Sequence, residues 1–153
     1  MLQVALWEPE IPPNTGNIAR LCAATGCPLH LVGRLGFRID EKSVRRAGLD
    51  YWDSVELHQH HSLSDLEEKL QKQNARLFCL SAHALTPYTK IPYKPGDCIL
   101  FGAETRGLPP EVMERYARQC YTIPMVSVKV RSLNLATAVG IVLYEGLRQL
   151  HGW

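Results

Sequence analysis

Two polar side chains, Ser132 and Asn134, stand between a strand-like run that ends at Met125 and an apolar, helix-like run that begins near Leu135. Serine is a favoured residue at the start of a helix, where its oxygen accepts a hydrogen bond from a free amide of the first turn. The first-turn amides that stay unpaired attract polar or anionic ligands. On this segment alone, helix capping and ligand binding explain the two side chains equally well.

A second polar group follows the first strand-like run and extends from Asn14 to Arg20. Asn14 is suited to cap the helix that follows it, and Gly16 allows another backbone to approach closely. Arg20 lies roughly 9 Å further along the helix axis, at about 1.5 Å per residue, so its long side chain can reach back to the helix start. Taken alone, Arg20 is better explained as an ordinary surface residue of an amphipathic helix.

The third polar group is the loop Gly102 to Gly107, which comes directly after an apolar run and holds Glu104 and Arg106 between its glycines. No Lys-Ser or Lys-Thr pair follows, so the loop does not support nucleoside triphosphate hydrolysis, and the chain has no Gly-x-Gly-x-x-Gly sequence. A flexible turn accounts for the glycines, but it does not account for Glu104 and Arg106 together.

The elements that must position these groups alternate between apolar strands and helices. The expected strands are 2–7, 29–32, 55–57, 77–81, 98–101 and 121–125, and the expected helices are 15–25, 41–47, 62–73, 109–118 and 133–150. Strands that are apolar throughout and alternate with helices indicate an α/β fold, in which a mostly parallel sheet is covered by helices on both faces. We expect one domain over residues 1–153. Each polar group follows a strand, and open α/β sheets place ligand sites at the carboxyl ends of their strands.

Composition limits the classes of protein. The chain has 153 residues, 46% of them hydrophobic, and its 17 Lys and Arg exceed its 15 acidic residues by only two. Such a weak positive charge does not by itself indicate a nucleic-acid partner. The five cysteines form no Cys-x-x-Cys pair, which is typical of a reduced, cytoplasmic protein. The longest apolar stretch, Leu135 to Tyr144, is too short to span a bilayer, so we expect a soluble protein without a membrane partner.

Two further clusters carry alternatives. The run His58 to His61 has no cysteine or carboxylate at matching ligand spacing, so we expect an exposed polar turn and no metal. A basic group is suited to phosphates, although a solvated helix face is the ordinary explanation; it comprises Arg34, Arg38, Lys42, Arg45 and Arg46. The last helix is apolar nearly all round between Leu135 and Leu143, which predicts either a homodimer through this helix or packing in the centre of the monomer.

Together the three polar groups resemble the SPOUT superfamily of S-adenosylmethionine-dependent RNA methyltransferases, over essentially the whole chain. The segments Glu8 to Asn17 and Arg45 to Tyr51 are similar to those of the small enzymes that methylate the ribose 2′-hydroxyl at the tRNA wobble position. The resemblance implies a C-terminal trefoil knot and a cofactor site between three loops. The implied cofactor-binding residues are Leu80, Gly102, Ile123, Met125 and Ser132.

The resemblance also implies a catalytic group, made of Arg20, Asn14, Glu104, Ser132 and Asn134. In this group Arg20 stabilises the developing alkoxide or grips a phosphate, because a guanidinium stays protonated and is a poor base. Asn14 and Asn134 orient Arg20 and the substrate, and Glu104 holds Arg20 or receives a proton through water.

The implied substrate is the tRNA anticodon loop, which Arg45, Arg46, Lys129 and Arg131 are expected to contact. The chain departs from the family between Met125 and Ser132, where it has neither Gly nor Pro and is a residue longer than usual. Two rival functions remain: ribose methylation at another tRNA position or in ribosomal RNA, and a non-catalytic RNA-binding module of the same fold.

Overall fold

The computed structural model describes residues 1–40, 42–47 and 51–153. The strands are β1 (Gln3–Trp7), β2 (Leu29–Val32), β3 (Leu57–His60), β4 (Leu77–Leu80), β5 (Cys98–Phe101) and β6 (Cys120–Tyr121). The α-helices are α1 (Pro12–Thr25), α2 (Lys42–Ala47), α3 (Leu63–Lys72), α4 (Pro110–Arg115) and α5 (Leu135–His151). Short 3-10 turns occupy η1 (Trp52–Ser54), η2 (Tyr88–Lys90) and η3 (Ala117–Gln119). This order confirms the predicted α/β class.

The six strands form one sheet in the order β3-β2-β1-β5-β4-β6, and every pair is parallel. The chain builds β1, β2 and β3 outward in one direction and then crosses to the other side for β4, β5 and β6. The strand order therefore reverses between β1 and β5, whose Ala5 and Leu100 are register partners. Crevices at such switch points, beyond the carboxyl ends of the strands, are the usual ligand sites of α/β sheets.

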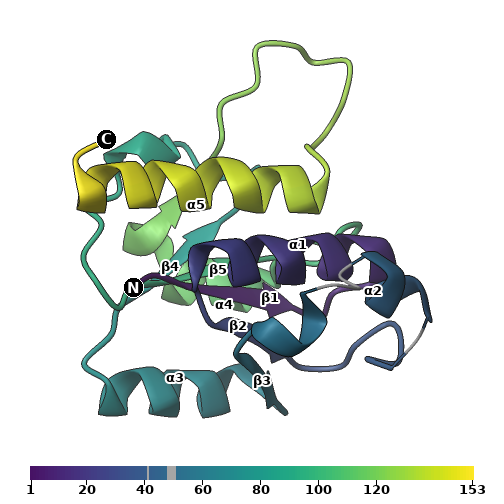
Figure 1. Cartoon of the computed structure of the whole chain (residues 1–153). Coiled ribbons are helices and arrows are strands. Elements are labelled where there is room, and N and C mark those ends of the chain that lie inside the picture. The colour runs from purple at the N-terminus through teal and green to yellow at the C-terminus, as the bar shows by residue number, and fades with distance from the viewer. Residues whose placement is uncertain (41, 48–50) are drawn as a thin grey trace.

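Two apolar layers cover the sheet. On one face, α1 and α5 bury Ile18, Val139 and Leu143 against β1, β2 and β5. On the other face, α3 and α4 bury Leu66 and Val112. Figure 1 shows α1 and α5 lying side by side above the sheet and α3 below it, while the segment before α5 rises out of the body as a long loop. The predicted covering of both faces is thus confirmed; the knot stays a prediction.

Several element boundaries differ from those expected. The helix α1 begins at Pro12, because a proline at the first helical positions needs no amide partner and has a helical φ. The strand β6 ends at Tyr121, four residues before the predicted end, and α4 stops at Arg115 and continues only as a 3-10 turn. The predicted bounds of the short helix at Glu41 and Gly48 lie outside the described residues.

The histidine run is not the exposed turn that the sequence predicted. His58 and His60 belong to β3, and His60 Nε2 lies 2.9 Å from Nδ1 of the fully buried His30 in β2. His30 Nε2 in turn lies 2.8 Å from Gln3 Oε1. Burial lowers the pKa of His30 to about 3, so the ring is neutral at physiological pH. The parallel register of β2 and β3, which pairs His30 with His58, creates this cluster.

Along the described ranges, no helix is both long enough and apolar enough to cross a membrane. In the same residues, no group of three or more His, Cys, Asp or Glu side chains is arranged to hold a metal ion.

Candidate active site at the switch point

The carboxylate of Glu104 joins the loops that follow β5 and β1. Its Oε1 accepts a hydrogen bond from the amide of Glu10 at 2.7 Å, and its Oε2 accepts one from the amide of Ile11 at 2.8 Å. Oε2 also accepts from Asn14 Nδ2 at 3.2 Å. A charged acceptor makes strong bonds to amides at a helix start, so Glu104 fixes the entry into α1. The expected Glu104–Arg20 contact is absent among the described residues.

Asn14 and Asn134 meet in space. Asn134 Nδ2 donates to Asn14 Oδ1 at 3.0 Å, and Asn134 Oδ1 accepts from the amide of Thr137 at 3.2 Å. The predicted cap at Asn14 is therefore wrong, and of the two capping candidates before α5 only Asn134 is confirmed. Asn14 lies inside α1, where its side chain bonds across to other elements, and α5 is capped by Asn134 instead of Ser132. A continuous row of hydrogen bonds runs from Glu104 through Asn14 and Asn134 to the first turn of α5.

The glycines of the third polar group are needed for a tight loop. A Cβ at Gly102 would lie 2.4 Å from the carbonyl carbon of Gly107, because Ala103 and Gly107 pair as an antiparallel bridge. Gly107 itself has φ +65°, a conformation that glycine adopts without strain. The tight loop turns Glu104 toward α1, which explains the glycines and the carboxylate together.

A second carboxylate, that of Glu10, returns the contact made by Glu104. Glu10 Oε1 accepts from the Thr105 amide at 2.9 Å and from Thr105 Oγ1 at 2.8 Å. These bonds, first the one from the backbone amide, lower the pKa of Glu10. Glu10 lies within the family-like segment Glu8 to Asn17 but had no predicted role. The signal that could have found it is a second carboxylate two residues before the Pro-Pro pair.

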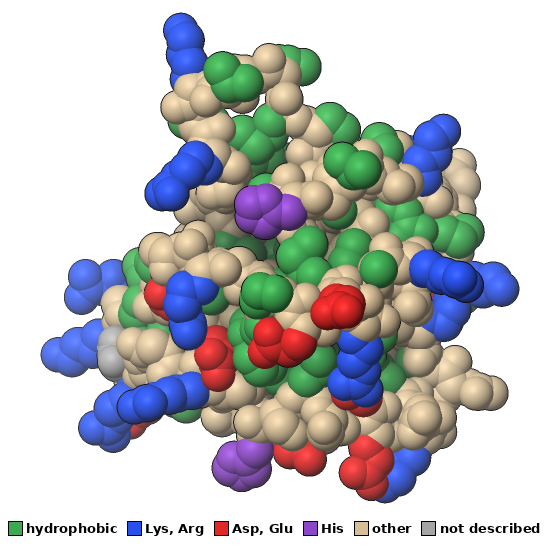
Figure 2. All heavy atoms as spheres, turned by 180° about the vertical axis from the view of Figure 1, so that it is seen from behind, with side chains coloured by type: hydrophobic (Ala, Val, Ile, Leu, Met, Phe, Trp, Pro, Cys, Tyr) green, Lys and Arg blue, Asp and Glu red, His purple; other side chains and the backbone are tan. Residues whose placement is uncertain are grey.

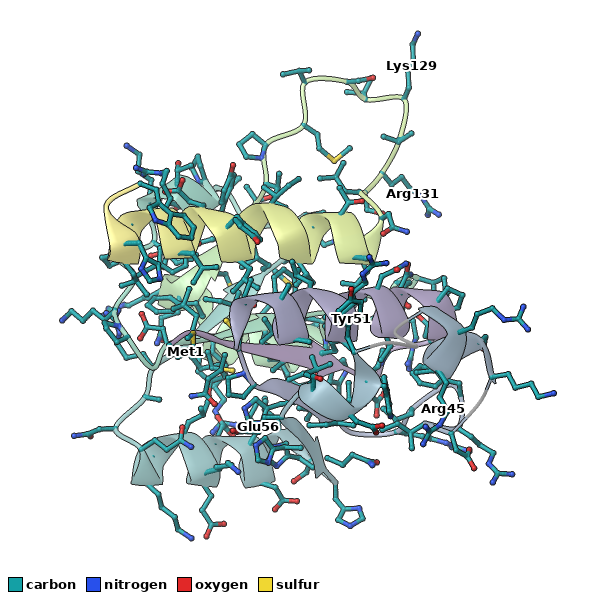
Figure 3. All side chains as sticks on the ribbon, in the orientation of Figure 1. Met1, Arg45, Tyr51, Glu56, Lys129 and Arg131 are labelled. Atoms are coloured by element: carbon teal, nitrogen blue, oxygen red, sulfur yellow. The ribbon has the colours of Figure 1, made fainter. Side chains whose placement is uncertain are left out.

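Arg20 lies on α1, exposed to solvent. Its guanidinium carbon stands 5.1 Å from the centre of the Tyr51 ring, a cation–π arrangement. Figure 3 labels Tyr51 in front of α1, where η1 packs against that helix. The structure thus assigns the tyrosine ring, and neither Asn14 nor Glu104, as the partner of Arg20.

The predicted cofactor walls gather at one end of the sheet. Leu80 is the last residue of β4, Gly102 directly follows β5, and Ile123 follows β6 and packs against the main core. Within the residues described, the amides of Ile123 and Met125 form no backbone hydrogen bonds. Apolar walls beside available amides fit an adenine, which needs a flat slot and a few backbone contacts. Ser132 is separated from these walls by the projecting loop and is exposed.

The predicted RNA-contacting residues fall into two groups. Arg45 and Arg46 are exposed on α2, which packs against α1. Lys129 and Arg131 stand on the projecting loop above α5, well away from Arg45 (Figure 3). Val126 and Val128, in the same loop, are fully exposed. A single chain therefore does not bring the four cations together.

Known proteins are similar to this chain over nearly its whole length. The SpoU rRNA methylase family matches residues 1–144. A tRNA (cytidine(34)-2'-O)-methyltransferase of Yersinia pestis is 48% identical over 98% of this chain and 94% of its own. The enzyme of that name in Escherichia coli strain K12 is 47% identical over the same shares.

Solved structures agree with these matches. A structure described as giving insights into the 2-OH methylation of C/U34 on tRNA superposes with a TM-score of 0.94 at 47% identity, covering 100% of this chain and 98% of the other. An AdoMet-bound rRNA methyltransferase from Sinorhizobium meliloti gives 0.86 at 28% identity, covering 97% of this chain and 56% of its own. With its switch-point site and full-length matches, the chain belongs to the SpoU rRNA methylase family.

Proposed function

We propose that this protein transfers a methyl group from S-adenosyl-L-methionine to the ribose 2′-hydroxyl of the wobble nucleotide of tRNA. The observation that carries the proposal is the full-length match, at 47–48% identity, to enzymes named for that reaction. The Glu104–Asn14–Asn134 row supports it, because it joins the three predicted loops at the switch point of the sheet. The whole chain acts as one domain, since both apolar layers share a single sheet.

When bound, S-adenosyl-L-methionine supplies a methyl group on a sulfonium, which is already a strong donor. Leu80, Ile123 and Met125 would hold its adenine, with the amides of the last two as polar contacts. The chain's own task is then to place the ribose oxygen in line with the methyl carbon and to ease the loss of its proton.

Arg20 is the cation of the site. Its guanidinium stays protonated, so it stabilises negative charge on the ribose oxygen as the hydroxyl proton passes to solvent water. The Tyr51 ring limits the directions in which the long Arg20 side chain can point. Holding the cation before substrate arrives reduces the ordering that must occur in the transition state.

Glu104, Asn14 and Asn134 position the site. Both oxygens of Glu104 already accept bonds from α1 and the segment before it, which assigns Glu104 to holding α1 in place. Asn14 accepts a hydrogen bond from Asn134, and Asn134 caps the start of α5, so the position of α1 also determines where α5 begins. The loop 122–133, which carries the cofactor walls, is therefore anchored at its far end by this row.

We further propose a homodimer through α5. Thr137, Ile141, Tyr144 and Arg148 follow one another at helical spacing, and Tyr144 is 47% exposed although it is large and aromatic. A second copy would cover this face and would bring its own Lys129 and Arg131 to the assembly. Tyr144→Arg should produce monomers in sedimentation analysis while wild type sediments as a dimer; two monomeric samples would refute the interface.

The free thiols of a reduced protein agree with a cytoplasmic enzyme.

Labelled methyl transfer to total tRNA, followed by mapping of the modified nucleotide, tests the function. A 2′-O-methyl group at the wobble nucleotide is the expected product. Label at another tRNA position, or label in ribosomal RNA when that is offered as substrate, would move the proposal to a related enzyme. Absence of transfer, with RNA binding retained, would indicate a non-catalytic module.

A further inference from the structure

A hollow of about 380 Å³ opens beside the proposed active site and has no role in the mechanism above. Its lining consists of Glu8, Glu10, Arg34, Leu35, Gly36 and Arg106. These residues follow β1, β2 and β5, which are neighbours at the switch point. The volume lies within the range of pockets that bind small organic ligands, about 300–1,000 Å³.

The hollow shares a wall with the Glu104–Asn14–Asn134 row. Glu10 lines the hollow and accepts a hydrogen bond from the amide of Thr105. Glu104, the residue before Thr105 in the chain, accepts a hydrogen bond from the amide of Glu10. Arg106 follows directly after Thr105 in the same tight loop. A ligand in this hollow would therefore lie next to the substrate group that the Glu104–Asn14–Asn134 row positions in the proposed active site.

The backbone at Glu8, which lines the hollow, is strained. Glu8 has φ +43°, unusual for a residue with a side chain, and its amide donates to Val32 at 2.8 Å. Gly33, at φ +80°, leaves room for the Glu8 side chain, since a Cβ there would lie 2.7 Å from Glu8 Cγ. Gly36 donates to the Pro9 carbonyl at 2.9 Å. Backbone strain maintained by surrounding contacts is concentrated at ligand sites.

The rim of the hollow is cationic although the lining contains two carboxylates. Arg106 Nη1 lies 3.4 Å from Glu8 Oε1, and the side chain of Arg106 is 58% exposed whereas that of Glu8 is 20% exposed. The other Glu8 oxygen accepts from the Arg34 amide at 3.0 Å. Both carboxylates thus have hydrogen-bond or ion-pair partners within the lining, and the side chains of Arg34 and Arg106 are exposed at the rim.

We propose that this hollow binds the nucleotide next to the methylated one, with its phosphate on Arg106 and its base against Leu35. The inference rests on the proposed function. Single-stranded RNA loops are recognised by splayed bases on apolar or guanidinium surfaces and by contacts to phosphates. Leu35 packs on the main core and supplies the apolar wall, and Glu8 is a positioning residue that holds Arg106. Figure 2 shows Lys and Arg side chains gathered at the edge that carries α2, so the backbone on either side of this nucleotide meets further cations.

The test compares Arg106→Gln with Arg118→Gln, a matched change at an exposed arginine in η3 outside the hollow. The probe is an anticodon stem-loop RNA, either unmodified or with one neutral methylphosphonate placed on either side of the target nucleotide. For wild type and Arg118→Gln, one of these neutral groups should weaken binding about tenfold. For Arg106→Gln the same group should have less than about a twofold further effect, because the contact is already lost.

A second readout is the salt dependence of RNA binding. Arg106→Gln should lower the slope of log K against log salt by about 0.7, the value for one phosphate of a single strand, and should leave cofactor affinity unchanged. Equal sensitivity of all three proteins to each methylphosphonate, with equal slopes, would overturn the subsite. If wild type methylates tRNA and Arg106→Gln behaves like Arg118→Gln, only this inference is wrong. If wild type transfers no methyl group to tRNA, the proposed function itself is wrong.

Discussion

Asn134 Nδ2 donates a 3.0 Å hydrogen bond to Asn14 Oδ1, across 120 positions of sequence. The same Asn134 caps α5 through its oxygen, which accepts from Thr137. One side chain thus uses its two ends for two tasks, starting the last helix and holding that helix to α1. The two tasks can be separated by substitution.

Asn134→Ala should remove both tasks, and Asn134→Asp should remove only one. Loss of an N-cap costs about 1 kcal/mol of stability, so we expect Asn134→Ala to lower the free energy of unfolding by about that amount. Asp still caps but has no donor for Asn14, so Asn134→Asp should keep the stability that comes from the cap, lose only that of the Asn14 contact, and lose more than about tenfold in kcat/KM. Urea unfolding and methylation rates provide the two measurements. Wild-type turnover in Asn134→Asp would contradict the positioning role.

Glu104→Gln should destabilise the junction of β1 and α1. A glutamine has one acceptor oxygen, so an amide of Glu10 or Ile11 loses its partner, at a cost of about 1–3 kcal/mol. Glu68→Gln is the control, because that carboxylate is 67% exposed and pairs with Lys72 in the same helix. Denaturant unfolding of both variants decides the matter; equal stabilities would show that Glu104 does not anchor α1.

Arg20 and Tyr51 should affect turnover to different degrees. Arg20→Ala should lower kcat more than about a hundredfold while cofactor binding is retained, because a cation at the reacting oxygen is lost. Tyr51→Ala keeps the Arg20 cation but removes the ring that restricts it. A cation–π contact at an exposed site is worth about 0.5–1 kcal/mol, so we expect kcat to fall a few-fold. Tyr51→Phe keeps the ring and should match wild type. Near-normal turnover of Arg20→Ala would remove Arg20 from the chemistry.

The Glu10–Thr105 contact should make stability depend on pH in the acid range. The folded-state pKa of Glu10 is lowered from its ordinary value of 4.5, so the charged form stabilises the fold above that pH. This contribution is lost as the pH falls through the lowered value. The stability difference between wild type and Glu10→Gln should therefore be largest near neutrality and shrink on acidification. A constant difference in urea midpoints across that range would show that the charge has no role.

His30 should also make the protein less stable in acid, beginning at higher pH. Its folded-state pKa is about 3 against an ordinary 6.5, mainly through burial, with smaller repulsion from His58, His60 and Lys69. Between these values the unfolded chain binds more protons, so stability rises with pH and is lost as the pH falls below 6.5, by at most about 1.4 kcal/mol per unit.

His30→Gln keeps a polar side chain that can reach Gln3 and should remove most of this slope, although His60, whose pKa burial also lowers, retains part of it. The measurement is the free energy of unfolding at several pH values between about 5 and 7. Parallel slopes in wild type and His30→Gln would contradict the assignment.

The sheet was predictable because its strands are apolar throughout and alternate with helices. Leu77 to Leu80 and Cys98 to Phe101 are buried at every position, as parallel central strands require. The start of α1 was also present in the sequence, since Pro12 and Pro13 suit the first turn. The prediction that Asn14 caps α1 relied on the Asn14 side chain and did not take Pro12 and Pro13 into account.

The partners of the polar side chains could not be read from local sequence. Ser132 and Asn134 are both good caps, and the choice of Asn134 coincides with its bond to Asn14, which exists only when α1 and α5 lie together. His60 is polar and stands in an edge strand, so only the register of β3 on β2 shows that it contacts a buried ring. Tertiary contacts decided these cases.

The paired Glu10 and Glu104 contacts have a mechanical consequence. They connect the segment after β1, which belongs to the β1–β2–β3 half of the sheet, with the segment after β5, which belongs to the β5–β4–β6 half. The two contacts therefore hold the two halves of the sheet together. A ligand bound at these contacts would oppose the separation of the two halves from each other. Its binding should therefore slow amide hydrogen exchange at the two opposite margins of the sheet together, in β3 and in β6, although neither margin touches it.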